Sequence, residues 1–272
     1  MKNKIYISGW SGRFGNNLEQ IASSVLFAKC VDGTTEVSMP NSNNYSHLLS
    51  TENNFFIDKE YDYNVVEFFD IDWNTNCYYT PALNYINEDY KSLIIENASN
   101  IFRKYIRPIL KFEDKNNDIS KDTLTIHLRG GDILDNTHSL YKQNFVNWEF
   151  YESVIQKYKN VIVCREDDKN PFYQRIVNFC LEKNIKIFNE KRDISEDYYI
   201  LLNSYNILLS GFSTFSLTAS YMNEKLNNFY YPKIVTDCQV HKENFRLKIL
   251  SKTQCKMHFY DNNAFLSELF FE

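Results

Sequence analysis

The placement of glycine constrains this chain more than any other feature, because six of its seven glycines fall at three places. These places are residues 9–15, residues 130–131 and Gly211. Glycine is the residue used where the backbone needs a positive φ or must come close to a ligand. Because glycine is rare in this chain, the positions of its glycines indicate where the backbone makes turns of special geometry. The three places therefore form the candidate active site.

Short apolar runs alternate with amphipathic segments along most of the chain, which predicts strands alternating with helices. The predicted strands are 4–8, 34–39, 123–128, 160–164, 185–188 and 206–210, and the predicted helices are 17–30, 89–105, 148–158, 172–183, 196–204 and 213–222. Residues 41–88 have weak periodicity and predict loops and short elements. The alternation predicts an α/β fold with parallel, doubly wound sheets, in which ligands bind at the carboxyl ends of strands. All three glycine sites lie at such ends.

The length of 272 residues allows one large or two modest domains. An Asn- and Asp-rich stretch at 113–122 resembles a linker. We therefore expect an N-terminal lobe at 1–121 and a C-terminal lobe at 122–272.

The charge balance and the lack of long apolar runs limit the kinds of partner that this protein can bind. Lys and Arg number 30 against 35 Asp and Glu, a formal net charge of −5, which disfavours general nucleic-acid binding. An anionic ligand must then be held by a few placed cations. The sequence has no apolar run near the roughly 20 residues of a membrane helix and no signal-peptide core at its start. Its six cysteines are scattered. We expect a cytoplasmic protein, with peripheral membrane association left open.

The first motif, GRFGNN at residues 12–17, lies between a predicted strand and a predicted helix. Backbone N–H groups at a helix start, together with Arg13, could bind an anion. The alternative is a tight turn that carries a surface arginine. The segment has neither the G-x-G-x-x-G spacing of a dinucleotide site nor the ending of a phosphate-binding P-loop.

The second motif, HLRGGD at residues 127–132, begins at a predicted strand end. Alternation places His127 and Arg129 on one face, and Gly130 and Gly131 let a ligand approach the backbone. The guanidinium of an arginine such as Arg129 can bind a phosphate through two parallel hydrogen bonds. In the alternative interpretation, Arg129 and Asp132 form a structural ion pair and His127 is a core histidine with its hydrogen bond satisfied.

The third motif, GFSTFS at residues 211–216, places the hydroxyls of Ser213 and Thr214 and free N–H groups at a predicted helix start. Such a start serves as a phosphate cradle or simply as an N-cap. Three unrelated structural turns would not be expected to occur in this order.

Together these motifs resemble the fucosyltransferase superfamily that uses GDP-fucose. Residues 12–17, continuing to LFAK at 26–29, resemble the G-R-F-G-N-Q and L-A-F-A-K segment of protein O-fucosyltransferases, and residues 16–20 resemble the G-N-Q-x-x-Q element of alpha-1,2-fucosyltransferases. Residues 126–132 are similar to the H-x-R-R-G-D signature of the alpha-1,2 and alpha-1,6 enzymes, and residues 197–216 to their D-x-Y-x-L…N-S-S-F-S block.

The chain departs from these patterns at two points. Gly130 stands where the bacterial and alpha-1,6 enzymes usually have a second arginine, and LTA at 217–219 replaces a pattern of tryptophans and glycine. The resemblance is therefore to the superfamily rather than to one linkage family.

The resemblance implies a GT-B-like architecture of two Rossmann-like lobes, with the donor bound in the cleft between them. The N-terminal lobe would carry the acceptor side and the C-terminal lobe the nucleotide-sugar donor side. The implied activity is an inverting transfer of fucose, or a related deoxyhexose, from a GDP-sugar to a glycan acceptor. Two alternatives remain: the same fold acting on another donor such as GDP-mannose or GDP-rhamnose, and a non-catalytic glycan- or nucleotide-binding module.

The resemblance also implies roles for individual residues. Arg129 would stabilise the charge that develops on the leaving diphosphate, Asn16 would approach the reacting groups from the other lobe, and Asp132 or Asp135 could act as an acceptor base, although a dissociative reaction needs none. The residues expected to bind the donor are Arg13, Gly15, His127, Gly130, Gly131, Ser213, Thr214 and Phe215.

A competing signal is Asp70 and Asp72, which have the D-x-D spacing of metal-dependent GT-A transferases. Two carboxylates at that spacing can hold Mg²⁺ or Mn²⁺ between donor phosphates. The three glycine motifs already supply groups that neutralise phosphate. We therefore expect neither a metal nor another cofactor.

Overall fold

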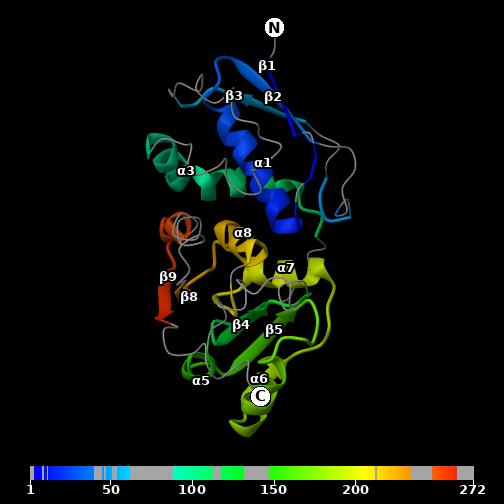
Figure 1. The fold of residues 1–272 in the computed structure, drawn as a ribbon, viewed down its shortest axis with the longest axis vertical. Coiled ribbons are helices and arrows are strands. Elements are labelled where there is room, and N and C mark those ends of the chain that lie inside the picture. Colours follow the sequence, from blue (N-terminus) through cyan, green and yellow to red (C-terminus); the bar gives the residue numbers. More distant parts are fainter. Residues whose placement is uncertain are drawn as a thin grey trace. The chain divides into compact units, whose positions relative to one another are not determined.

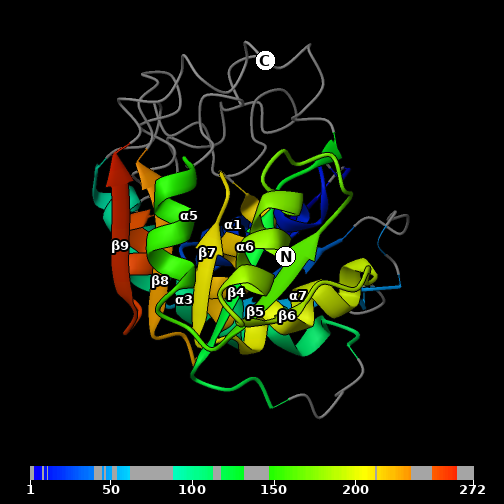
Figure 2. The same ribbon diagram turned by 90° about the horizontal axis from the view of Figure 1, so that it is seen from below.

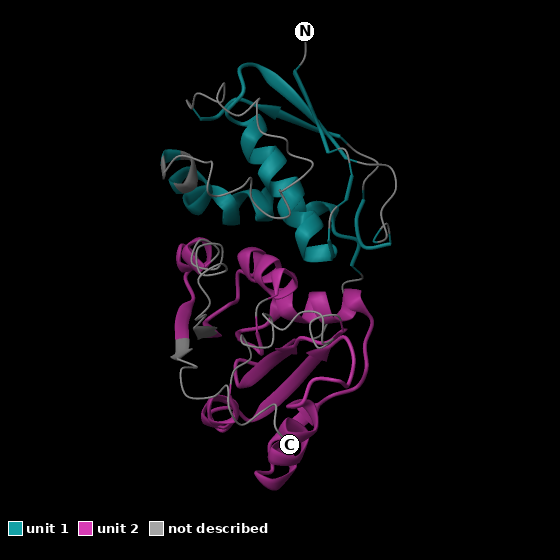
Figure 3. Ribbon diagram, viewed as in Figure 1, with its two compact units in different colours: residues 1–113 teal, residues 114–272 magenta. Residues whose placement is uncertain are grey.

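The computed structural model divides the chain into two compact units, residues 1–113 and residues 114–272 (Figure 3). The division falls in the Asn- and Asp-rich stretch that resembles a linker. The structure describes residues 3–7, 9–10, 12–39, 45, 47–50, 54–61, 88–112, 118–131, 147–211, 213–233 and 247–261. Each unit is described by itself.

Unit 1 is a small α/β unit built on the first glycine turn (Figure 1). Its elements are β1 (Asn3–Tyr6), α1 (Phe14–Ala28), β2 (Thr34–Ser38), β3 (Phe55–Asp58) and α3 (Glu88–Ile101). β1 pairs with β2 in parallel and β3 pairs with β2 antiparallel, in the order β1-β2-β3. The apolar positions of α1 recur at helical spacing and are fully buried at Leu18, Ile21 and Val25. The unit therefore contains a β1–α1–β2 crossover with the turn at residues 9–15 leading into the helix.

The helix predicted at 89–105 is α-helical only as far as Ile101. The chain continues through a wider π-helical turn, Phe102–Ile106, and a 3-10 turn, Arg107–Ile109, that contains Pro108. Proline lacks an N–H group and cannot continue an α-helical ladder, so the change of winding precedes it. Ile106, at the end of the π-helical turn, is fully buried.

The described residues of unit 2 form a six-stranded parallel sheet with the Rossmann strand order. Its elements are β4 (Thr123–Leu128), α5 (Trp148–Ile155), β5 (Asn160–Arg165), α6 (Tyr173–Glu182), β6 (Lys186–Phe188), α7 (Ile194–Asn203), β7 (Asn206–Leu209), α8 (Thr214–Met222), β8 (Asn228–Lys233) and β9 (Lys256–Asp261). The strands lie in the order β6-β5-β4-β7-β8-β9, and every pair is parallel. Counted from β4, this is the order 3-2-1-4-5-6 of dinucleotide-binding domains.

The two faces of this sheet differ in chemistry because side chains alternate along β4. Leu124, Ile126 and Leu128 join the apolar core formed with α5 and α6. Thr125 and His127 point to the other face, where they bond to Ser204, just after α7, and Ser216 of α8. Figure 1 shows α7 and α8 on one side of the sheet and α5 and α6 on the other, and Figure 2 shows α5 and α6 in front of it. The polar face of β4 is thus the face of α7 and α8.

The α/β class predicted from the sequence is confirmed in both units, and six predicted strands are present within one or two residues of their expected bounds. Three strands were not predicted: β3, inside a stretch expected to be loops and short elements, and β8 and β9, which complete the sheet of unit 2. No helix in the described part of the chain has the length and apolar character needed to span a bilayer.

Candidate functional site

The second and third glycine motifs meet at the point where the strand order of unit 2 reverses. β4 and β7 are neighbours, with His127 paired to Leu209 at their carboxyl ends. The pairing continues one step further, because Ser210 N donates to His127 O at 3.1 Å. In open parallel sheets, ligands bind outside the carboxyl ends of the strands at this switch point. The fold therefore brings Arg129 and the start of α8 to the expected binding edge.

The backbone that carries Arg129 is held by side chains from two other segments. Arg129 N donates to Ser210 Oγ at 2.8 Å, and Asn170 Nδ2 donates to Arg129 O at 2.9 Å. Gly131 N donates to Asp167 Oδ2 at 2.9 Å. The loop after β4 is thus tied both to the end of β7 and to the loop after β5.

The glycines of this loop make room for protein as well as for any ligand. A Cβ on Gly130 would lie 2.4 Å from the Asp167 carboxylate, and one on Gly131 would lie 2.8 Å from that of Glu166. Gly131 also has φ +60°, which side chains rarely adopt. Each of these glycines therefore accommodates a carboxylate from the loop after β5, and their role in ligand approach stays a prediction.

His127 is buried and its imidazole is neutral. Only 7% of the residue is exposed, its Nδ1 shares a hydrogen bond with Ser216 Oγ, and its ring lies 5.5 Å from that of Phe215. Burial, with the nearby charge of Arg129, lowers the pKa of His127 to about 3. The interpretation of His127 as a satisfied core histidine agrees with these contacts. Among His127 and Arg129, the arginine alone carries charge at neutral pH.

The start of α8 has the features of an anion site rather than of a capped helix. Ser213 occupies the N-cap position but makes no side-chain capping bond, and the first turn contains no acidic residue. The residue is 2% exposed, and within the described residues its Oγ has no hydrogen-bond partner. Ser213 thus occupies the N-cap position without the side-chain bond of a cap, and its role toward phosphate stays a prediction. A helix N-terminus with an uncompensated dipole and a buried hydroxyl favours an anionic oxygen.

The candidate residues of the first motif belong to unit 1. Gly12 has φ +72°, and a Cβ there would lie 1.9 Å from the Asn16 side-chain amide. Arg13 is the N-cap of α1 and makes no side-chain cap bond. Gly15 and Asn16 are buried in the first turn, since α1 begins three residues earlier than predicted. The sequence interpretation of Gly15 as part of the turn is thus corrected: the turn depends on Gly12. That Arg13 and Asn16 share a site with Arg129 stays a prediction.

Four of the acidic candidates, Asp70, Asp72, Asp132 and Asp135, lie outside the described residues, so their roles stay predictions. Within the described ranges, no group of three or more His, Cys, Asp or Glu side chains is arranged to hold a metal ion.

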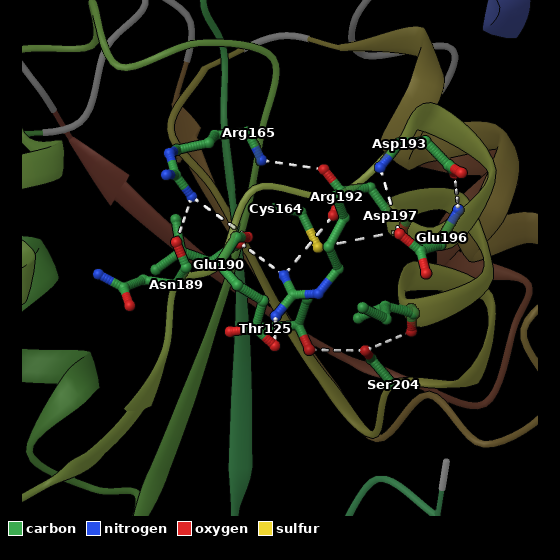
Figure 4. A network of polar contacts seen from close by, with 12 residues as sticks. Thr125, Cys164, Arg165, Asn189, Glu190, Arg192, Asp193, Glu196, Asp197 and Ser204 are labelled. Carbon is green, nitrogen blue, oxygen red and sulfur yellow. Dashed lines mark hydrogen bonds and ion pairs between the residues drawn. The ribbon is translucent and has the colours of Figure 1, made fainter. Parts of the chain in front are cut away.

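A buried charge network joins the end of β5 to α7 (Figure 4). Asp197 Oδ2 accepts a bond from Arg165 N at 3.1 Å, and Arg192 Nη1 lies 3.7 Å from Asp197 Oδ1. Arg192 also donates to Val163 O at 3.1 Å. Burial raises the pKa of Asp197 to about 6, although Arg192 opposes the shift. The network fixes the carboxyl end of β5, next to the loop that contacts Gly131.

Sequence reasoning missed four residues that shape this site. Ser210 and Ser216 lie in or beside the third motif but were given no role, and Asp167 and Asn170 were not considered. A usable signal existed for the last two, because the polar run at 165–170 directly follows a predicted strand and so belongs to the same edge of the sheet.

Comparison with protein-family models and with curated protein sequences gives no match. Comparison with solved structures finds crystal structures of POFUT1. POFUT1 in complex with GDP-fucose is 13% identical, with a TM-score of 0.46, over 81% of this chain and 94% of the other. POFUT1 in complex with GDP is 13% identical, with a TM-score of 0.46, over 84% and 98% of the two chains. The apo form is 14% identical, with a TM-score of 0.45, over 81% and 94%. Matches at this identity and TM-score leave the chemistry of this chain to be inferred from its own residues.

We expect His127 to stay neutral in the folded protein from pH 8 down to about pH 4, since its pKa is lowered to about 3. The unfolded chain binds a proton near pH 6.5, so this residue makes the free energy of unfolding rise with pH between about 3 and 6.5, by up to about 1.4 kcal/mol per pH unit. Asp197, whose pKa is raised from 3.8 to about 6, contributes the opposite slope over that interval.

The pH dependence is best measured as the difference in unfolding free energy between wild type and His127→Asn. Urea titrations from pH 4 to 7 should show this difference shifting in favour of wild type as pH rises. NMR of the imidazole gives a direct check. A ring that titrates near pH 6.5 in the folded protein would contradict the assignment.

Proposed function

We propose that this protein is a glycosyltransferase that transfers fucose, or a related deoxyhexose, from a GDP-sugar to a glycan acceptor. The observation that carries the proposal is the combination of Arg129 with the start of α8 at the switch point of unit 2. A buried Ser213 hydroxyl without a partner in the described residues lies in the same place. Support for the donor comes from the three motifs, which resemble those of the GDP-fucose-dependent superfamily.

The leaving group of the reaction is a nucleoside diphosphate, and this determines what the site must stabilise. Glycosyl transfer breaks the bond between the anomeric carbon and the β-phosphate oxygen, and negative charge grows on the departing diphosphate. Fixed donors aimed at that charge stabilise the transition state. Arg129 supplies a planar cation, and the N-terminus of α8 supplies N–H groups and the positive end of its dipole. With a neutral His127 beside it, Arg129 carries this task.

His127 then has a role other than charge. A neutral imidazole held at Nδ1 by Ser216 presents a fixed ring edge at the nucleotide side of the site. In this proposal Gly130, Gly131, Thr214 and Phe215 line the donor side, and Arg13 and Asn16 of unit 1 remain candidates for the leaving phosphate or the acceptor. Asp132 or Asp135 is the candidate base, and a dissociative reaction needs none.

Donor hydrolysis tests the catalytic proposal directly. Purified protein incubated with GDP-fucose should release GDP slowly without acceptor and faster with a suitable glycan. GDP-mannose and GDP-rhamnose serve as competing donors. Tight GDP binding with no turnover of any donor would instead indicate a binding module.

Arg129→Ala should abolish turnover and weaken GDP binding. Loss of one such charged donor typically costs about 2.7–4 kcal/mol in the transition state. Arg129→Lys keeps the positive charge but cannot make two parallel hydrogen bonds to a phosphate, so its turnover should remain strongly reduced. The matched control is Arg175→Ala, because Arg175 is exposed on α6 and stacks on Trp148 at 4.3 Å. Wild-type kinetics in folded Arg129→Ala protein would remove this residue from the mechanism.

Ser213→Ala should weaken GDP binding by about 10-fold or more, since a hydrogen bond to a charged group contributes about 1.5–3 kcal/mol. Its unfolding free energy should not fall and should rise by up to about 1–3 kcal/mol, because no capping bond is lost and a buried hydroxyl without a partner is removed. Asp193→Ala is the reciprocal control: Asp193 caps α7 by accepting from Glu196 N at 2.8 Å, and its loss should cost about 1 kcal/mol without affecting binding. The reverse pattern would make Ser213 a structural residue.

We also propose that the reaction needs no metal ion, because Arg129 and α8 balance the diphosphate with fixed charge whereas a D-x-D site draws that charge from a divalent ion. Activity should survive excess EDTA, and the double variant Asp70→Asn, Asp72→Asn should keep most of it. Complete loss with EDTA, restored by Mn²⁺, would transfer the role to Asp70 and Asp72.

A further inference from the structure

Asn170 is a buried amide that joins two segments through opposite ends of its side chain. It is 2% exposed. Its Nδ2 donates to Arg129 O at 2.9 Å, and its Oδ1 accepts from Phe172 N at 3.0 Å. The second bond, with Tyr173 N donating to Asn170 O at 3.0 Å, shapes the turn that starts α6. The first bond has no part in that turn and ends on the residue proposed to hold the diphosphate.

Three side chains fix the main chain around Arg129 from different directions. Ser210 Oγ accepts from Arg129 N, Asn170 Nδ2 donates to Arg129 O, and Asp167 Oδ2 accepts from Gly131 N. Both main-chain polar groups of Arg129 are therefore bound by side chains from beyond its own loop. The peptide planes on either side of its Cα are held, and they determine the direction in which the side chain leaves the backbone.

We propose that Asn170 is a positioning residue for Arg129, acting on the guanidinium through the peptide plane between Arg129 and Gly130. The inference rests on the proposed function of Arg129 as the diphosphate-binding cation. A charged group in a catalytic site must be held to within about 0.5 Å of its working position. Asn170 touches no substrate in this proposal.

The chemistry of the two bonds explains why an amide suits this position. One end must donate to a carbonyl and the other must accept from an N–H. Asn170→Asp keeps the acceptor for Phe172 N and so keeps the turn before α6. It replaces the donor with a carboxylate oxygen that faces Arg129 O, and that contact is repulsive while the carboxyl is ionised.

Asn223 provides a closely matched control. It is also 2% exposed, its Nδ2 donates to Leu201 O at 3.0 Å and to Ser204 O at 2.7 Å, and its Oδ1 accepts from Lys225 N at 2.8 Å. It follows α8, at the amino edge of the sheet where β8 begins. Asn223→Asp therefore makes the same chemical change in a similar buried setting, away from Arg129.

The experiment compares wild type, Asn170→Asp, Asn223→Asp and Arg129→Ala in the full chain. Calorimetry with GDP measures binding, thermal melting measures stability, and hydrogen exchange without ligand measures the protection of the amides at 129–131. Asn170→Asp should lose at least 10-fold in GDP affinity and exchange these amides faster. Asn223→Asp should lose comparable stability but keep wild-type affinity and protection at 129–131.

A pH series adds a readout that general destabilisation does not produce. When the carboxyl of Asn170→Asp is protonated it can donate to Arg129 O, so its affinity relative to wild type at the same pH should recover as pH falls from 8 to 5. The relative affinity of Asn223→Asp should stay flat.

Wild-type affinity and unchanged exchange in Asn170→Asp, with binding lost in Arg129→Ala, would overturn the positioning role alone. Equal loss of affinity in the two Asn→Asp variants would also overturn it, in favour of general destabilisation. If wild type binds no GDP, the proposed function fails and the inference fails with it, whatever the exchange data show.

Discussion

The parallel pairing of β4 with β7 is the interaction on which the candidate site depends. The bond from Ser210 N to His127 O extends the ladder past the last paired residues and places the loop after β4 beside the segment that starts α8. Without this register, Arg129 and Ser213 would lie on unrelated parts of the chain, 84 positions apart in sequence. The same pairing turns one face of β4 toward α7 and α8. That is the reason a histidine and a threonine can occupy buried positions in the middle of a sheet.

Three buried polar pairs lie among the apolar side chains along that face. Thr125 bonds to Ser204, His127 to Ser216, and Tyr198 of α7 to Thr218 of α8. Buried polar pairs of this kind need exact geometry to offset the loss of water, so they hold the two helices in one position on the sheet. The opposite face carries the ordinary apolar core with α5 and α6. Both faces are packed, and the face toward α7 and α8 also carries these polar pairs.

Local sequence patterns were sufficient to predict most strands and helices, because apolar runs and helical spacing are properties of neighbouring residues. They predicted the edge of the sheet at which the second and third motifs meet, since parallel strands present their carboxyl ends together. They did not predict β8 and β9, where Asn228–Lys233 and Lys256–Asp261 are mixed polar and aromatic rather than apolar. Nor did they assign Asp167 and Asn170, whose importance comes from contacts some 40 residues away in the chain. The N-cap of α8 shows the converse: a serine in a capping position makes no capping bond, which only the fold reveals.

The buried Ser213 hydroxyl, which has no hydrogen-bond partner among the described residues, affects the stability of unit 2. A buried polar group without a partner lowers the stability of the folded state by about 1–3 kcal/mol. A ligand oxygen that accepts from Ser213 recovers part of this energy, so ligand and fold stabilise each other. Under the proposed function, unit 2 would gain part of its stability from its ligand. Variants chosen solely for a higher melting temperature would tend to replace the buried Ser213 hydroxyl with an apolar group. Such variants would gain stability and lose ligand binding.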